Sequence, residues 1–336
     1  MIRNMLRIGV IPAVVSVVAA VLTAAPGVAD APDGSAVTGT WPVDANTVQL
    51  RVHSAAMNTN IMVNVQRPAD PKAPAGVLYL LNGGGGGQDS ATWQRNTDVQ
   101  RFLSGKQVIV VQPVGGRWSY YTDWRARDPK LGLYKWKTFL TEELPPLIAA
   151  TFPTTGANAV AGLSTSGTSV LQLPIAKPGL YRAVAAYSGC AQISDPIGRE
   201  FVKLAVEDWG GGDTVNMYGP DDDPMWAAND PYVHAAGLRG LKLFISSGSG
   251  IPGRYDTYDG AHMLPGVSGY ADQMVIGGVI EAAVNWCTHN LRTRLGQLGI
   301  PATFDFEPSG THSWGYWQDA LKRSWPVLAA GLGVPV

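Results

Sequence analysis

The chain carries little charge for its size. Of its 336 residues, 15% are Asp, Glu, Lys or Arg, and the formal net charge is −1. Globular proteins carry about 25% charged residues. The sequence therefore offers no electrostatic basis for binding a nucleic acid or another polyanion. Because 46% of the residues are hydrophobic, the composition instead predicts one large buried core.

Cysteine is scarce as well. The sequence holds two, Cys190 and Cys287. An oxidising compartment would permit a disulfide between them. The sequence leaves a disulfide and two buried thiols as equal alternatives.

Long apolar runs are missing after the N-terminal region, so no later segment is expected to span a bilayer. The N-terminal region is typical of a secretory signal, with Arg3 and Arg7 before an apolar run, Ile8 to Ala24, and small residues after it. We expect residues 1–31 to be a signal peptide and residues 32–336 to be an exported domain. A membrane anchor is the less favoured alternative, because no positive stop-transfer cluster follows.

Strand and helix patterns alternate along the chain, without an internal repeat. The first two strand candidates alternate apolar and polar residues, as an antiparallel edge does, and the middle ones are continuous apolar runs, as in a buried parallel sheet. The strand candidates are Thr47–Arg51, Met62–Gln66, Gly76–Leu81, Val108–Gln112, Ala157–Gly162, Ala183–Tyr187, Leu241–Ser246 and Ala302–Phe306. The helix candidates are Thr92–Ser104, Trp136–Thr151, Ser166–Ala176, Ala271–Leu295 and Tyr316–Leu332.

This order predicts the α/β class, with an α/β-hydrolase fold: a mostly parallel sheet of eight strands flanked by helices. Residues 32–45 are expected to be a short leader or a loose tail. Residues 190–240 interrupt the alternation, and we expect them to form an insertion over the active site that shapes a substrate cleft. A surface excursion without a binding role is the alternative.

The motif with the most chemical content is Gly162-Leu163-Ser164-Thr165-Ser166-Gly167. It follows a strand candidate and opens a helix candidate, which is the context of the nucleophile elbow of α/β-hydrolases. Small residues are needed two positions before and after the serine because the turn is tight. Ser166 stands where the usual pattern has glycine. A small-residue turn without catalytic function is the alternative for this motif.

A serine nucleophile needs a histidine base, and the histidine needs an orienting carboxylate. In this fold the acid and then the histidine follow the serine in the chain. His312, in a loop between the last strand and the last helix candidate, is the expected base. The acid is open at this point. The loop after Leu241–Ser246 offers Asp256, Asp259 and Asp272, and Glu281 lies in an apolar helix further on.

The glycine-rich segment Asn82-Gly83-Gly84-Gly85-Gly86-Gly87 follows the third strand candidate. In this fold that loop and the residue after the nucleophile supply the two N–H groups of the oxyanion hole. A flexible linker or a phosphate-binding loop is the alternative, but Gln88-Asp89 lacks the Lys and Ser or Thr of a Walker motif.

Several strings of residues carry a resemblance to a known family. They are Leu78-Tyr79-Leu80-Leu81-Asn82-Gly83, Tyr120-Tyr121-Thr122-Asp123-Trp124, Tyr134-Lys135-Trp136-Lys137-Thr138-Phe139-Leu140, Gly162-Leu163-Ser164 and Gly310-Thr311-His312-Ser313-Trp314, followed by Tyr316-Trp317. Over about residues 45–330 the chain resembles the mycolyltransferases of the antigen 85 complex and, more broadly, the esterase-like proteins of actinobacteria that carry mycolates.

The resemblance implies site residues. It favours Glu281 over Asp256 as the acid, with Ser164 as the nucleophile, and it places the oxyanion amides at Thr165 and Gly84. The family holds its trehalose acceptor with an aspartate and an arginine, where this chain has Asn82 and Gly85. We expect Asn82 to bind a sugar hydroxyl without charge, while Gly85 offers no side chain. Trp314, one of eleven tryptophans, is expected beside the substrate, although core packing explains most of them.

The expected function is a secreted serine acyltransferase of the cell envelope. It would move a long-chain acyl group from an ester or glycolipid donor to a sugar, with trehalose as one candidate acceptor. No cofactor, metal or nucleic acid is implied. A peripheral contact with the cell envelope is expected. A secreted carboxylesterase and a non-catalytic surface binding protein are the alternatives.

Overall fold

The computed structural model describes residues 31, 33–263 and 265–336. In this part of the chain one sheet has the strand order β1-β2-β3-β5-β4-β6-β7-β8-β9. From β1 to β5 each neighbouring pair is antiparallel, and from β5 to β9 each is parallel. The strands are β1 Ala36–Pro42, β2 Thr47–Ser54, β3 Thr59–Gln66, β4 Ala75–Leu81, β5 Val108–Val114, β6 Thr154–Leu163, β7 Ala183–Tyr187, β8 Lys242–Ser247 and β9 Thr303–Phe306.

The sheet has one strand more than the eight expected, and the difference lies at the N-terminal edge. The segment expected to be a leader or loose tail contains β1, which pairs antiparallel with β2. The strand pattern there is weak because Gly39 and Pro42 interrupt it. The Trp41 ring covers Gly39 so closely that a Cβ there would lie 2.5 Å from a ring carbon. The glycine is therefore part of how this edge packs.

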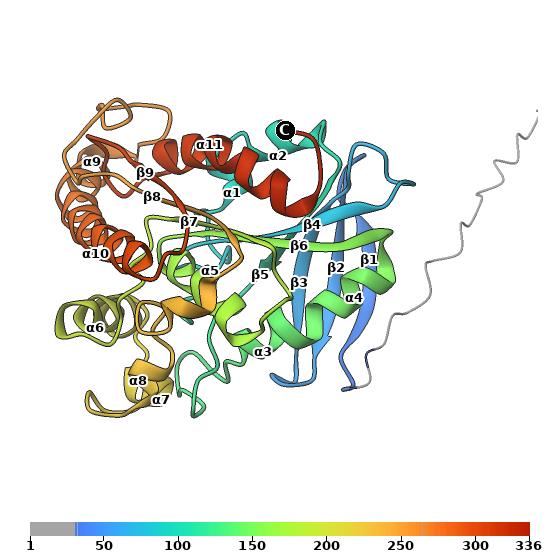
Figure 1. Ribbon diagram of the computed structural model, residues 1–336, viewed down its shortest axis with the longest axis horizontal. Helices are drawn as coiled ribbons and strands as arrows, with labels where there is room; N and C mark the ends of the chain where they lie inside the picture. The colour runs from blue at the N-terminus through green and yellow to red at the C-terminus, as the bar shows by residue number, and fades with distance from the viewer. Residues whose placement is uncertain (1–30, 32, 264) are drawn as a thin grey trace, which may run out of the picture.

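Helices cover both faces of the sheet (Figure 1). The helical elements are α1 Trp93–Asn96, α2 Val99–Ser104, α3 Trp136–Thr138, η1 Phe139–Glu143, α4 Leu144–Thr151, α5 Thr165–Ala176, α6 Pro196–Lys203, η2 Leu204–Trp209, α7 Thr214–Tyr218, α8 Met225–Ala228, η3 Ala235–Leu238, α9 Gly266–Asp272, η4 Gln273–Gly277, α10 Gly278–Gln297 and α11 Trp314–Leu332. The expected helix Thr92–Ser104 is divided in two, because Thr97 has extended backbone angles.

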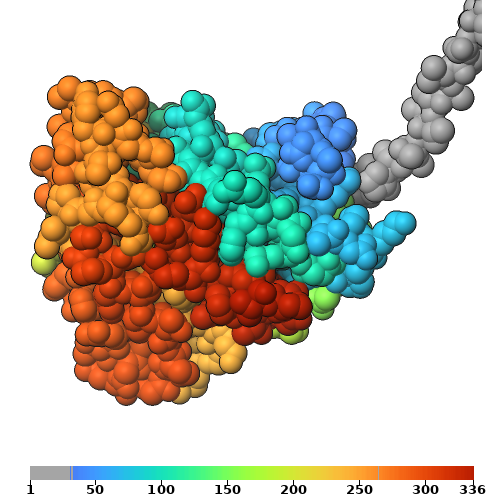
Figure 2. Space-filling model, turned by 90° about the horizontal axis from the view of Figure 1, so that it is seen from above, coloured from blue at the N-terminus to red at the C-terminus, as the bar shows by residue number. Residues whose placement is uncertain are grey.

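Two buried clusters hold these layers together. One side of the sheet packs against α1, α2 and α11, with Trp93, Leu103 and Trp325 in the contact. The other side packs against α4, α5 and α10. Figure 2 shows the face on which α11 lies beside the segment of α9 and α10. All seven residues of β4 are buried, as its continuous apolar run predicts.

The segment expected to be an insertion connects β7 to β8. It holds α6, η2, α7, α8 and η3, which gather at one end of the molecule in Figure 1. A disulfide joins Cys190, at the beginning of this segment, to Cys287 in α10. The sequence left the pairing of these cysteines open, and the structure settles it in favour of the disulfide.

The expected signal peptide, residues 1–31, lies almost wholly outside the described residues. Within the described ranges, none of the helices has the length and apolar character to cross a membrane. The parallel strands β4, β6, β7, β8 and β9 all end at the same edge of the sheet. The loops that follow them therefore converge, as parallel strands require.

Candidate active site

Ser164 lies on the sharp turn between β6 and α5. Its φ of 57° is unusual for a residue with a side chain. The Ser164 N–H donates to the carbonyl oxygen of Tyr187 at the end of β7, over 2.9 Å. A Cβ at Gly162 would lie 2.5 Å from the Ser166 hydroxyl. The turn thus requires glycine before the serine, as the motif predicts.

Ser166, which replaces the glycine of the usual motif, forms hydrogen bonds within the turn. Its hydroxyl accepts from the Leu163 N–H and donates to the Leu163 carbonyl, both over 2.9 Å. It thereby satisfies backbone groups at the end of β6, where the pairing of the strand stops. The serine in this variant of the motif stabilises the turn.

The loop after β4, the strand beside β6, and the beginning of α5 bring further groups to Ser164. The glycine-rich loop after β4 places Gly84 in the same cleft, and Thr165 is the first residue of α5. A side chain at Gly84 would collide with the Trp118 ring, 2.4 Å from a built Cβ. Among the described backbone hydrogen bonds, the N–H groups of Gly84 and Thr165 donate to no acceptor. Both are therefore open to an oxyanion.

His312 and Glu281 are in direct contact. The His312 Nδ1 and the Glu281 Oε2 lie 2.7 Å apart. Glu281 is 1% exposed, at the beginning of α10. The backbone N–H of His312 donates to the carbonyl oxygen of Gly277, the residue directly before α10. This bond fixes the histidine loop against the helix that bears Glu281. Of the carboxylates that the sequence left open, Glu281 is the one bonded to His312.

The other oxygen of Glu281 holds the residues around it. Its Oε1 accepts from the Ser188 hydroxyl over 2.7 Å and from the Gly248 N–H over 2.6 Å. Ser188 in turn accepts from the Trp317 indole N–H over 2.9 Å, and the Trp317 ring meets His312 edge to face. These contacts fix the position of the Glu281 carboxylate beside His312.

Sequence reasoning missed Ser188 and Trp317 as supporting residues. Ser188 follows β7 directly, so the rule that sites form at the carboxyl ends of parallel strands could have found it. Its φ of 50° is also in the left-handed region. Trp317 stands in one of the strings that carry the family resemblance, but the sequence indicates no role for it beside His312.

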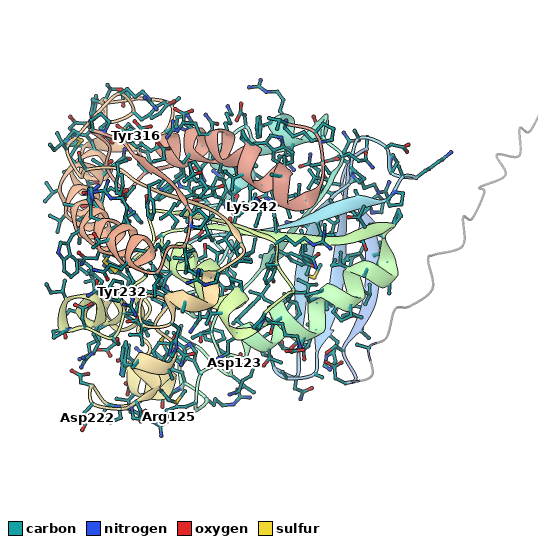
Figure 3. All side chains as sticks on the ribbon, viewed as in Figure 1. Asp123, Arg125, Asp222, Tyr232, Lys242 and Tyr316 are labelled. Atoms are coloured by element: carbon teal, nitrogen blue, oxygen red, sulfur yellow. A yellow bond between two sulfur atoms is a disulfide. The ribbon has the colours of Figure 1, made fainter. Side chains whose placement is uncertain are left out.

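Asp256, the main alternative for the acid, is also buried but holds a different set of partners. Its Oδ1 accepts from Thr311 and Gln273, and its Oδ2 accepts from the Gly253 N–H and the Tyr316 hydroxyl. Tyr316, labelled in Figure 3, lies at the beginning of α11. Burial alone would raise the pKa of Asp256, but these hydrogen bonds together lower it below its ordinary value.

Two further histidines and the other two carboxylates lie away from this contact. His262 bonds to the Asn96 carbonyl, and His289 stacks on Phe306. In the described part of the chain, Asp259 and Asp272 have no hydrogen bond to His312. The described residues also contain no group of three or more His, Cys, Asp or Glu arranged to hold a metal.

A cleft of about 400 Å³ connects Ser164 to His312. One wall comes from the 190–240 segment, including Ile193, Phe201 and Trp209. Trp314 lines the cleft and is 9% exposed. Among the described hydrogen bonds, none joins Ser164 directly to His312; such bonds are often long before a substrate binds.

Asn82 requires a correction. It was expected to bind a sugar, but it is 2% exposed and does not line the cleft. Its Oδ1 accepts from the Trp93 N–H over 3.2 Å. The glycine loop also turns tightly over it, since a Cβ at Gly87 would lie 2.5 Å from the Asn82 amide nitrogen. Asn82 therefore fixes this loop to α1 instead of facing a ligand.

With this geometry in place, comparison with known proteins gives the family. The family model described as "Putative esterase" matches residues 54–327. The diacylglycerol acyltransferase/mycolyltransferase Ag85A of Mycobacterium leprae is 35% identical over 84% of this chain and 83% of its own length. The chain belongs to this esterase family, with the Ag85 mycolyltransferases as relatives. The Ag85A of Mycobacterium tuberculosis H37Rv is 33% identical over 91% of this chain and 88% of its own length.

Solved structures show the same fold. The MPT51 (FbpC1) structure from Mycobacterium tuberculosis covers 86% of this chain and 100% of that chain, with 25% identity and a TM-score of 0.69. An S-formylglutathione hydrolase from Agrobacterium tumefaciens, at 15% identity, covers 88% of this chain and 99% of that one with a TM-score of 0.63. The latter shows the α/β-hydrolase fold alone. The names of the relatives support an acyltransferase or esterase activity.

Proposed function

We propose that the chain is a serine acyltransferase whose triad is Ser164, Glu281 and His312. The observation that carries this proposal is the 2.7 Å contact between Glu281 and His312, in the cleft that Ser164 also lines. Each of these residues comes from a loop or helix at the carboxyl edge of the sheet.

In the proposed reaction, His312 takes the proton of the Ser164 hydroxyl as the serine oxygen attacks the carbonyl carbon of an acyl ester. The N–H groups of Gly84 and Thr165 stabilise the negative oxygen of the tetrahedral intermediate. Glu281 orients the His312 ring and stabilises its positive charge. His312 then gives its proton to the leaving alcohol, and an acyl-enzyme remains.

The cleft supports an apolar acyl chain as the group that is transferred. Its walls include Leu163, Val202, Ala205 and Ile280, with Trp118 and Trp209 in contact at a ring distance of 6.0 Å. Apolar and aromatic walls favour the burial of a long hydrocarbon chain. The acyl-enzyme would then pass its acyl group to a sugar hydroxyl, with trehalose as one candidate.

A carboxylesterase is the second candidate, and one observation favours it. Asn82 and Gly85 do not offer the cleft a polar side chain, since Asn82 is buried behind the loop and Gly85 has none. An enzyme that does not retain an acceptor and exclude water transfers its acyl group to water.

The proposed location is outside the cytoplasm, at the cell envelope. The Cys190–Cys287 disulfide supports this, because such bonds persist in oxidising compartments. The apolar N-terminal sequence, proposed to be a signal peptide, supports it as well.

Labelling with a fluorophosphonate tests the nucleophile. The wild-type protein should react, and Ser164→Ala should not. Ser166→Ala is the matched control, since its hydroxyl lies two residues away and bonds within the turn. Equal labelling of the wild type and Ser164→Ala would reject Ser164 as the nucleophile.

Product analysis tests the reaction. The protein is incubated with a long-chain acyl ester in the presence and absence of trehalose, and the lipids are separated. An acyl-trehalose product supports the transferase. Free fatty acid as the sole product under both conditions would reject sugar transfer and support the esterase.

A further inference from the structure

A second cavity, of about 760 Å³, lies beside the cleft that contains Ser164. Among the described residues, none lines both cavities. The two come nearest in sequence at Trp118, which lines the first, and Arg117, which lines the second. The walls of the second cavity are the turn between β2 and β3, the segment after β5 and the loop before α3. The proposed acyl transfer makes no use of this cavity.

The charged side chains that line the second cavity are all cations. They are Arg117, Arg127 and Lys130, and the described lining residues include no carboxylate. In the part of the chain that the structure describes, none of these three side chains donates a hydrogen bond or joins an ion pair. By contrast, the nearby Arg125 pairs with Asp223. Three cations around one cavity repel one another, and a bound anion would offset that repulsion.

Asp128 holds the loop that carries two of these cations. Its Oδ1 accepts from the backbone N–H groups of Lys130 and Leu131, over 2.8 and 2.9 Å. Its Oδ2 accepts from two donors at the beginning of α7. The backbones of Asp128 and Gly132 also bond to each other in both directions over 2.9 Å. Both carboxylate oxygens are thus used to shape the loop, which presents its cations on a closed turn.

Two uncharged donors at the wall of the cavity have no acceptor. The Trp136 side chain is 3% exposed, and its indole N–H has no partner among the described residues. The backbone N–H of Gly116, another lining residue, donates to none of the described acceptors. A Cβ on Gly116 would lie 2.9 Å from the Trp136 Nε1, so the two groups are neighbours. Buried donors are nearly always satisfied, and two exceptions side by side indicate that a ligand supplies the acceptor.

We propose that this second cavity is an anion site, and that its ligand is a phosphate group, carried by a small phosphate ester or by a lipid headgroup. Arginine binds phosphate oxygens through paired N–H groups, and lysine adds a point charge. The indole and backbone N–H groups can donate to the same oxygens. A neutral ligand would leave the three cations unpaired. The site does not depend on the acyltransferase function proposed above.

Calorimetric titration of the protein with inorganic phosphate and with glycerol 3-phosphate, at constant ionic strength, tests the site. We expect the wild type to bind with a Kd of about 1 mM or below. The double variant Arg127→Gln/Lys130→Gln should bind at least about 10-fold more weakly, as expected for lost bonds to charged groups. Because both side chains are exposed, this variant should keep the wild-type urea midpoint of unfolding.

Arg67→Gln/Lys242→Gln is the matched control. It also removes one arginine and one lysine, both exposed, from positions that do not line the cavity. Lys242 is labelled in Figure 3. The control should keep the wild-type Kd. An equal loss of affinity in the two double variants would show that the net charge of the protein attracts phosphate, and would overturn the site.

Trp136→Phe tests where in the cavity the anion lies. The variant keeps an aromatic ring and removes the indole N–H, so it should weaken phosphate binding by about 3- to 10-fold. An unchanged Kd would contradict the contact between the anion and the indole.

Cosedimentation with vesicles distinguishes the two sources of phosphate. The vesicles are phosphatidylcholine with and without phosphatidylglycerol. Binding that requires phosphatidylglycerol and is lost in Arg127→Gln/Lys130→Gln identifies a lipid headgroup, whereas binding of the soluble phosphates alone identifies a small ester. If the wild type binds neither, or the Arg127 and Lys130 variant binds as the wild type does, the site is wrong. Ser164→Ala should bind phosphate normally, so a failure of the proposed reaction leaves this test intact.

Discussion

Two buried carboxylates lie near the histidine loop, and their surroundings differ. Glu281 bonds to His312, which can carry a charge, and to Ser188 and Gly248. Asp256 bonds to uncharged donors, including Thr311, the residue directly before His312. Neighbouring residues of one loop are therefore held by two different acids.

This difference shows how a carboxylate near a histidine can be assigned a role. Every oxygen of Asp256 is occupied by a donor that does not take part in proton transfer, so it fixes the loop in position. Glu281 directs one oxygen at the imidazole and uses the other to hold its own surroundings. Burial alone does not distinguish them, since both are less than a tenth exposed.

The largest expected effect is that of Glu281→Gln. The amide cannot stabilise the imidazolium, and it can hold His312 in the wrong tautomer, so kcat/KM for ester hydrolysis should fall by about 10³- to 10⁴-fold. Glu143→Gln is the matched control. Glu143 is also 1% exposed and bonds to Ser54 and Ala56, away from the cleft. If both variants lose activity equally, Glu281 acts through stability alone.

Removal of the disulfide should have the next largest effect. The bond joins residues 97 positions apart and ties α10, which bears Glu281, to the segment after β7. The double variant Cys190→Ser/Cys287→Ser should lose about 2–4 kcal/mol in the free energy of unfolding, measured by urea denaturation. Activity should be lost at a lower urea concentration than in the wild type. An unchanged urea midpoint of unfolding would show that the stability of α10 does not depend on this disulfide.

Asp256→Asn should reduce stability more than turnover. The amide NH₂ would face two of the donors that now point at the carboxylate, which leaves them unsatisfied in a buried position. We expect a loss of about 1–3 kcal/mol in the free energy of unfolding, and less than a 10-fold loss of kcat at a temperature where the variant is folded. A loss of kcat as large as that of Glu281→Gln would reverse the roles assigned to the two acids.

The smallest expected effect is a dependence of stability on acid pH. Because the folded-state pKa of Asp256 is lowered, its contribution is present above the unfolded-state pKa of about 3.9 and is lost as the pH falls through the lower folded-state value. The Tm difference between the wild type and Asp256→Asn should therefore narrow as the pH falls below about 4. A constant difference would contradict the lowered pKa.

The elements that could be predicted from the sequence are those set by hydrophobic periodicity and by short motifs. The buried runs of β4 and β7 and the elbow at Ser164 follow from periodicity and from the need for small residues in a tight turn. The choice between Glu281 and Asp256 could not follow from pattern, because it depends on which acid a loop far along the chain approaches. The resemblance to a family supplied that choice.

The parts that sequence reasoning missed depend on packing across distance. Asn82 was expected to bind a sugar because it stands where the family has an acceptor-binding aspartate, but its amide oxygen accepts from the backbone N–H of Trp93 in α1. β1 was hidden by the glycine and proline in its sequence, and pairing with β2 overrides their low strand propensity.

The backbone at Ser164 has a further consequence. Its φ of 57° and ψ of −126° belong to a region that glycine enters freely and that costs other residues about 1–3 kcal/mol. A glycine at this position would give a protein that is harder to unfold and that lacks the oxygen proposed as the nucleophile. Thermodynamic stability by itself would therefore never select serine at the centre of this turn, whereas the need for a nucleophile would.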